Sequence, residues 1–399
     1  MPRGYRFDRL EFAGSLGDLG TLLPIALAMI LVNGLDPVGL FVSIGLFYVL
    51  AGIYYGVTVP VQPMKVIGAY AVATSMAPSQ ILASSLLLGI LLLIIGLTGA
   101  ITLVERYTPK PVIRGVQLAT GALLMSGGIK FMLGESAFQE LKGAAEPYLA
   151  LQALGPVPLG ILIGAVGGLV TLLLMDNRKI PAGLTTVLGG LLLGGLLGAG
   201  SELKGVGLGL HLPEFMPFGF PGQADFTFAL FALVLPQLPM TLGNAVLAYT
   251  DLSRQYFGQD SAKVSNRAVC VSMALANGLS FFLGGMPLCH GAGGLAAHYR
   301  FGARTAGSNL MIGAIFIVLP LILGGDIVSV LHLLPLAILG VLLVFAGAQL
   351  ALTVLDLTER SDLFVALLIL GITLASNLAA GFLAGIAAAY CLRWTGVRV

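Results

Sequence analysis

The chain has 399 residues, of which 57% are hydrophobic and 10% charged, and its net charge is +2. Soluble domains carry about 25% charged residues, so this chain has too little charge to cover the surface of a soluble globule. We therefore expect an integral, multi-pass membrane protein that lies in a lipid bilayer. The near-neutral charge gives no indication of a nucleic-acid partner.

The hydrophobic runs, taken in chain order, predict fourteen membrane elements. A spanning helix needs about 20 apolar residues. Two shorter runs, 63–75 and 289–300, follow proline-containing breaks and are predicted to be half-helices. The segment 134–155 has apolar residues three to four apart, which predicts an amphipathic helix at the membrane interface. The twelve longer runs lie near residues 12–33, 37–58, 78–104, 112–133, 156–175, 181–200, 225–250, 265–284, 304–324, 327–352, 362–376 and 378–393.

The basic residues predict how these elements are oriented. With the N-terminus inside, sixteen of the 20 Lys and Arg residues fall on the inner side, three fall outside and Lys65 lies within the membrane. Basic residues accumulate on the cytoplasmic side, and a miscount by one element would remove this asymmetry. Both half-helices must therefore count as crossing units. The first eleven residues show no cleavable signal pattern, and we expect a plasma (inner) membrane protein with both termini in the cytoplasm.

The two halves of the chain share a positional pattern. Pro60 and Pro287 each precede a half-helix at the third place in a set of seven elements, and segments 14–24 and 236–244 each put polar residues and helix breakers inside a span. The sequence therefore predicts an all-α polytopic protein of two inverted seven-element repeats, 1–200 and 201–399, with half-helices at elements 3 and 10. Interrupted segments at matching positions indicate a transporter binding site.

The half-helices are the predicted anion site. A helix that starts near the membrane midplane exposes up to four backbone donors and the positive end of its dipole, and two such ends that face each other would bind an anion. Lys65 in a first turn is unfavourable against the dipole unless an anion or carboxylate is near. The glycine-rich start of the second half-helix, residues 290–294, has tight helix packing as its alternative role. The expected binding residues here are Gln62, Pro63, Met64, Lys65, Gly291, Ala292 and Gly293.

Polar residues inside other spans are further candidates. Asp18 is interpreted either as a proton-coupling group or partner of Lys65, or as the cap of a broken helix. His290 is either a protonatable ligand that couples transport to protons or a hydrogen-bond donor to backbone. Candidate oxyanion donors, with interhelical hydrogen bonding as the alternative role, are Thr21, Gln237, Thr241 and Asn244.

Other functional classes find little support in the sequence. Arg114 and Arg300 are interpreted as cytoplasmic anchors of their helices. The three cysteines and four histidines are scattered, so no metal site is expected, and no cofactor is implied. No nucleophile elbow, phosphate-binding loop or dinucleotide fingerprint is present. We therefore do not expect an enzyme.

Four motifs carry a family resemblance: GSLGDLGT at 14–21, PVQPMK at 60–65, LPQLPMTLGNAV at 235–246 and CHGAGGLAAHYRFGAR at 289–304. Together they resemble the molybdate transporters related to the SulP sulfate permeases. The resemblance implies a core domain of elements one to four and eight to eleven, with the remaining elements forming a gate domain. It also implies proton-driven molybdate uptake, without the STAS domain of ordinary SulP proteins, and leaves a homodimer open.

Several rival functions remain open from the residues alone. Moving a dianion inward against a negative interior costs about 4.6 kcal/mol per 100 mV, so we expect symport with protons and alternating access of one site. The same machine carrying sulfate or another oxyanion is the first alternative, because similar donors bind any tetrahedral dianion. A nucleobase permease is disfavoured by Lys65, whereas an anion channel remains a separate class.

Overall fold

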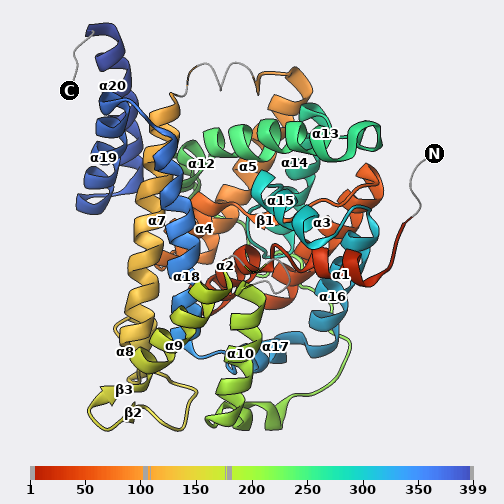
Figure 1. Ribbon diagram of the computed structural model, residues 1–399, viewed down its shortest axis with the longest axis vertical. Helices are drawn as coiled ribbons and strands as arrows, with labels where there is room; N and C mark the ends of the chain where they lie inside the picture. The colour runs from red at the N-terminus through yellow and green to blue at the C-terminus, as the bar shows by residue number, and fades with distance from the viewer. Residues whose placement is uncertain (1–4, 102–106, 108, 176, 178–181, 396–399) are drawn as a thin grey trace.

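The computed structural model describes residues 5–101, 107, 109–175, 177 and 182–395 (Figure 1). The described part of the chain is mostly helical, and its strands are two antiparallel pairs of two-residue segments. Within it, seven helical stretches are long and apolar enough to cross a membrane, judged by length and composition. Three shorter apolar helices, Thr21–Leu31, Leu159–Leu174 and Ala182–Leu196, accompany them.

The elements of the first half include short helices beside the long ones. They are α1 (Arg9–Ser15), α2 (Leu19–Leu31), α3 (Pro37–Tyr55), β1 (Gln62–Pro63), α4 (Lys65–Ala73), α5 (Pro78–Thr98), α7 (Lys110–Leu133), α8 (Ala137–Lys142), β2 (Ala153–Leu154), β3 (Val157–Pro158), α9 (Leu159–Leu174), α10 (Ala182–Leu196) and η1 (Ala199–Gly205).

The second half contains the remaining elements. They are α11 (Gln223–Phe228), η2 (Ala229–Val234), α12 (Leu235–Met240), η3 (Thr241–Ala248), α13 (Tyr249–Phe257), η4 (Gly258–Ser261), α14 (Asn266–Phe282), β4 (Leu288–Cys289), α15 (Ala292–Phe301), α16 (Gly307–Leu323), η5 (Gly324–Asp326), α17 (Ile327–Leu331), α18 (Leu336–Ala351), η6 (Leu352–Asp356), α19 (Arg360–Ala375) and α20 (Leu378–Thr395).

Most predicted spans coincide with helices, and the two predicted short helices are present as α4 and α15, with nine and ten residues. The run 12–33 is broken between α1 and α2 at Gly17 and Asp18, where the sequence predicts an interruption. The run 78–104 is helical as far as Thr98, and its residues 102–104 lie outside the described part. Residue 181 of the run 181–200 also lies outside it.

Three expectations need correction. The segment 134–155 is not one amphipathic helix: α8 has six residues and ends at Gly143, which takes a left-handed conformation, and the β2–β3 hairpin follows. The run 327–352 is divided because Pro335 lacks an amide hydrogen and α18 begins after it. The run 225–250 belongs to one long helix, 223–261, that contains the π-helical segments η2 and η3 around Pro236 and Pro239.

Glycines set the closest helix contacts. The most extensive helix pairs are α7 with α18, α5 with α14 and α3 with α16, and α7 lies beside α18 along the long axis in Figure 1. A Cβ on Gly128 would overlap the carbonyl oxygen of Gly340, and a Cβ on Gly340 would overlap that of Gly128. Gly121 and Gly347 repeat this reciprocal contact two turns away. Small residues that let backbones approach in this way are typical of membrane helices.

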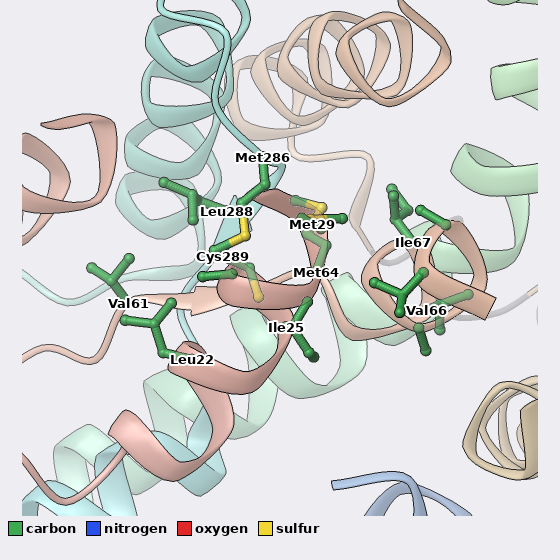
Figure 2. Close-up of a cluster of buried hydrophobic side chains, with 14 of the residues drawn as sticks. Leu22, Ile25, Met29, Val61, Met64, Val66, Ile67, Met286, Leu288 and Cys289 are labelled. Atoms are coloured by element: carbon green, nitrogen blue, oxygen red, sulfur yellow. The ribbon is translucent and has the colours of Figure 1, made fainter. Parts of the chain in front are cut away.

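A hydrophobic cluster holds the centre of the molecule together (Figure 2). It joins Leu22, Ile25 and Met29 of α2 to residues that flank the β1–β4 pair. Met64 and Leu288 belong to this cluster and are at most 1% exposed. Because close-packed side chains fix their neighbours, the cluster holds the starts of α4 and α15 in defined positions.

Candidate anion-binding site

The strand pair β1–β4 brings the two short helices together. Gln62 pairs with Cys289 and Pro63 with Leu288 in antiparallel register, and the Met64 amide donates a hydrogen bond to the Pro287 carbonyl at 3.0 Å. The two strands therefore run in opposite directions. As a result, α4 and α15 begin at opposite ends of the same short pair.

The start of α4 is capped by a side chain from the long helix 223–261. Gln237 Oε1 accepts hydrogen bonds from the amides of Val66 at 2.9 Å and Ile67 at 3.3 Å, while its Nε2 donates to Thr241 Oγ1 at 2.9 Å. Gln237 and Thr241 are both 1% exposed. These two predicted oxyanion donors therefore bind the protein itself.

The start of α15 differs, because no described residue accepts a hydrogen bond from its first amides. Those of Ala292, Gly293 and Gly294 donate no hydrogen bond to another described residue. A Cβ built on Gly293 would meet nothing within 4 Å, and this glycine is exposed to open space. Unbonded amides at a helix N-terminus, together with the helix dipole, favour an anion.

Asp18 and Gln62 pack behind this helix start. Gln62 Nε2 donates to Asp18 Oδ1 at 2.7 Å, and both side chains are buried. A Cβ on Gly294 would overlap Asp18 Oδ2 and lie 2.7 Å from Gln62 Nε2, whereas one on Gly291 would overlap Gln62 Oε1. Asp18 Oδ2 and Gln62 Oε1 have no hydrogen-bond partner within the described part of the chain. Glycine is thus required where the carboxylate meets the helix.

Two adjoining cavities open at this place, with volumes of about 360 and 320 Å³. Asp18, Gln62 and Arg300 line the first, and Arg114 and Asn244 line the second. Five residues line both and mark their junction: Thr21, Lys65, Gly293, Ala346 and Gln349. The Lys65 ammonium makes no ion pair or hydrogen bond with another described residue. Lys65 and Asp18 are therefore not joined as an ion pair, although both face the first cavity.

The structure thus separates the predicted site residues into two groups. Thr21, Gln62, Lys65, Asn244, Gly293 and Asp18 line a cavity, whereas Pro63, Met64, Gln237, Thr241, Gly291, Ala292 and His290 line neither.

His290 is enclosed on all sides. Its Nδ1 lies 2.9 Å from the Pro60 carbonyl oxygen and its Nε2 lies 3.0 Å from Ser272 Oγ. Its ring stacks on Tyr249 with centroids 5.3 Å apart, and the residue is 0% exposed. These contacts fix the loop between β4 and α15 rather than present the ring to a ligand.

Sequence reasoning missed several cavity residues. Arg114 and Arg300, interpreted as anchors, line cavities, and Arg114 Nε donates to Asp356 Oδ1 at 2.9 Å while its Nη1 donates to Gln117 Oε1 at 2.9 Å. Gln349 was not singled out. Its signal is nonetheless present, because it is the single hydrogen-bonding side chain in the helix Leu336–Ala351.

The arrangement has the chemistry of an anion site. At the junction it combines the Lys65 ammonium, the Gly293 backbone at the positive end of a helix and the Thr21 hydroxyl, and neither the ammonium nor the Gly293 amide is hydrogen-bonded to a residue that the structure describes. Two guanidinium groups line the approaches. Charge-assisted hydrogen bonds of these donors are strongest to oxyanions, so the geometry favours an oxyanion over a neutral ligand.

Comparisons with known proteins identify relatives of this chain. A family model described as a molybdate transporter of the MFS superfamily matches residues 10–124 and 229–350. Molybdate transporter 1 of Arabidopsis thaliana is 32% identical over 96% of this chain and 87% of its own length. Molybdate transporter 2 of the same plant is 31% identical over 94% and 85%, respectively. Molybdate transporter 1 of Chlamydomonas reinhardtii is 31% identical over 94% and 90%.

Solved structures show the fold. The transmembrane domain of the cyanobacterial bicarbonate transporter BicA is similar with a TM-score of 0.66, 17% identity and coverage of 96% of this chain and 97% of that one. Murine Slc26a9, an anion transporter solved in an inward-facing state, is similar with a TM-score of 0.66, 16% identity and coverage of 100% and 70%. The fold is thus that of the SLC26-like transporters, and the protein is a multi-pass integral membrane protein. On the strength of the family model and the curated relatives, the chain belongs to the molybdate transporter family.

Proposed function

We propose that this protein imports molybdate across the plasma membrane by alternating access, driven by protons. The single observation that carries the proposal is the junction of the two cavities, where the Lys65 ammonium and the start of α15 at Gly293 line the same space and neither has a hydrogen-bond partner in the described ranges. A dianion there would gain both a counter-charge and backbone donors. The names of the curated relatives support molybdate as that dianion.

An inverted repeat of two seven-element halves, 1–200 and 201–399, belongs to the proposal. The most extensive helix pairs support it, because a two-fold axis in the membrane plane would exchange α3–α16 with α5–α14 and would map α7 onto α18. The antiparallel β1–β4 pair fits the same axis. Under this scheme α2 to α5 and α12 to α16 form the core domain, and the remaining spans, including α7 and α18, form the gate domain that rocks against it.

The conformation fits an inward-facing carrier under the proposed orientation. With both termini in the cytoplasm, Arg114 and Arg300 lie toward the cytoplasmic ends of α7 and α15. Arg300 lines the first cavity and Arg114 the second, so the anion would leave toward the cytoplasm past positive charge.

Proton coupling is assigned to Asp18. It is buried, it faces the first cavity and one of its oxygens lacks a partner among the described residues. His290, the other proposed carrier of protons, lines neither cavity and has both ring nitrogens engaged, so the geometry favours Asp18. Charge balance requires such a group, because each inward dianion is opposed by about 4.6 kcal/mol per 100 mV.

Calorimetry on the purified full chain tests the binding site. We expect molybdate to bind the wild type and Lys65→Ala to weaken binding at least about tenfold, because a hydrogen bond to a charged group is lost. Lys130→Ala, at the exposed end of α7, is the matched control and should bind as the wild type does. Titration with sulfate distinguishes the rival substrate. A Lys65→Ala protein with unchanged affinity would contradict the proposed site.

Proteoliposome uptake of labelled molybdate tests the coupling. An inward proton gradient should accelerate uptake in the wild type, whereas Asp18→Asn should retain molybdate binding and lose the response to the gradient. Uptake that is indifferent to both the pH gradient and the voltage would remove the proton-coupling claim, and turnover in the range of a channel current would replace the carrier by a channel.

A further inference from the structure

Gln349 occupies an unusual position in α18. All other side chains of this helix, Leu336–Ala351, are apolar or absent. Polar groups inside membrane helices are costly unless they find a partner, and they therefore commonly mark functional sites. Gly347 and Leu350 beside it are buried, yet Gln349 itself is exposed.

Gln349 is exposed at the junction of the two cavities. It lines both of them together with Lys65, Thr21 and Gly293. Its carboxamide makes no hydrogen bond with another described residue. By contrast, Gln117 on the neighbouring helix α7, which lines the second cavity alone, is held by Arg114 and Thr353. Gln349 is therefore a donor with no partner in the described part of the chain, at the place where the anion is proposed to bind.

The helices that line this junction approach it from different parts of the fold. Lys65 begins α4 and Gly293 lies in the first turn of α15, and both helices start beside the β1–β4 pair. Gln349 comes from α18, which packs on α7 through reciprocal glycine contacts. The junction is thus lined by residues of α2, α4 and α15 and by Ala346 and Gln349 of α18.

We propose that Gln349 is a binding residue for the transported oxyanion and donates a hydrogen bond from Nε2 across the cavity from Lys65 and Gly293. The ligand class is a fully deprotonated tetrahedral oxyanion, because every oxygen of such an anion accepts hydrogen bonds. The inference rests on the proposed anion site and adds a contact from α18. The bound anion then contacts α4 and α15 as well as α18.

Two substitutions of similar length test this role by calorimetry with molybdate on the purified full chain. Gln349→Glu keeps the shape but places a carboxylate beside the anion, and Gln349→Met keeps the length but removes the donor. Both should weaken molybdate binding at least about tenfold, with the larger loss for Gln349→Glu. Gln80→Glu on α5, which lines neither cavity, is the matched control and should bind as the wild type does. Thermal unfolding in detergent shows that each variant is folded.

The outcomes separate this inference from the function on which it rests. Wild-type protein that binds molybdate, with Lys65→Ala impaired and Gln349→Met unimpaired, would overturn the role of Gln349 and leave the proposed function intact. Wild-type protein that binds neither molybdate nor sulfate would overturn both. If Gln349→Glu fails to fold, Gln349→Met decides alone, because an apolar side chain of the same length suits an apolar helix.

Discussion

The starts of α4 and α15 look alike in the sequence but differ in the structure. Each follows a proline-containing extended segment, and each begins at one end of the β1–β4 pair. At α4, Gln237 satisfies two amides. At α15, three amides remain unbonded among the described residues, and Gly293 in this first turn lines both cavities. The two helices therefore contribute differently to an anion site, α4 through the Lys65 side chain and α15 through its backbone.

Removing the cap of α4 should lower the stability of the protein more than any other change considered below. Gln237→Leu would leave the buried amides of Val66 and Ile67 without an acceptor, at a cost of about 1–3 kcal/mol each. We expect the melting temperature in detergent to fall strongly. Gln237→Glu retains an acceptor for both amides and should be close to the wild type, so equal loss in both variants would show that the cap is not what stabilises α4.

A methyl group at Gly294 should have the next largest effect. Its Cβ would overlap Asp18 Oδ2 and crowd Gln62 Nε2 at 2.7 Å, and overpacking of this kind costs about 1–3 kcal/mol. Gly294→Ala should therefore lower the free energy of unfolding. Gly278→Ala on α14, where a Cβ meets nothing within 4 Å, is the control, and equal stability of the two variants would contradict the close contact.

Substitution of the neighbouring Gly293 should weaken molybdate binding and leave stability unchanged. A Cβ at Gly293 meets nothing within 4 Å, so Gly293→Ala should keep the wild-type melting temperature. Its methyl group would occupy the space in which the α15 amides meet the anion, and we expect about a tenfold weaker molybdate affinity from the loss of one such hydrogen bond. Calorimetry beside thermal unfolding checks both halves, and unchanged affinity would place the anion away from α15.

A third helix start sharpens the comparison through the pH dependence of stability. Glu146, in the loop after α8, accepts hydrogen bonds from the amides of Leu336 at 2.9 Å and Ala337 at 2.8 Å at the start of α18. Burial raises the pKa of Glu146 to about 7, although these two hydrogen bonds act to lower it. A carboxyl with a raised pKa binds its proton more readily in the folded state, so its contribution is fully present below pH 4.5 and is lost as the pH rises through 7.

Glu146→Gln should remove this pH dependence. Wild-type stability, measured by thermal unfolding between pH 4.5 and 8, should fall relative to the variant with a slope of at most about 1.4 kcal/mol per pH unit. Glu140→Gln, on the exposed face of α8, is the matched control. Parallel curves for the wild type and Glu146→Gln would contradict the shifted titration.

The fold was largely predictable because bilayer thickness and helix breakers act locally. Proline and glycine next to short apolar runs marked α4 and α15, and apolar length marked most long helices. The interfacial helix at 134–155 was wrong because Gly143 takes a left-handed conformation and ends α8. The division before α18 was missed because Pro335 lies within an otherwise apolar run.

The candidate site was only partly predictable, because partners across the fold decide what a polar group does. Lys65, Asp18 and Gly293 were found from their unusual settings, and all three line a cavity. Gln237 has the same kind of setting, yet it faces the start of α4. Gln349 was overlooked although its helix contains no other hydrogen-bonding side chain. Composition indicates that such a group needs a partner, and only the packing of distant helices tells which.

The reciprocal glycine contacts between α7 and α18 have a mechanical consequence. Backbone meets backbone at Gly121 with Gly347 and at Gly128 with Gly340, so the two helices cannot slide past each other without steric collision. The two helices should therefore move as one rigid unit. Arg114, in the second turn of α7, is hydrogen-bonded to Asp356 at the end of η6, which follows α18, so the two segments are also tied together at this end, beside the second cavity that Arg114 lines.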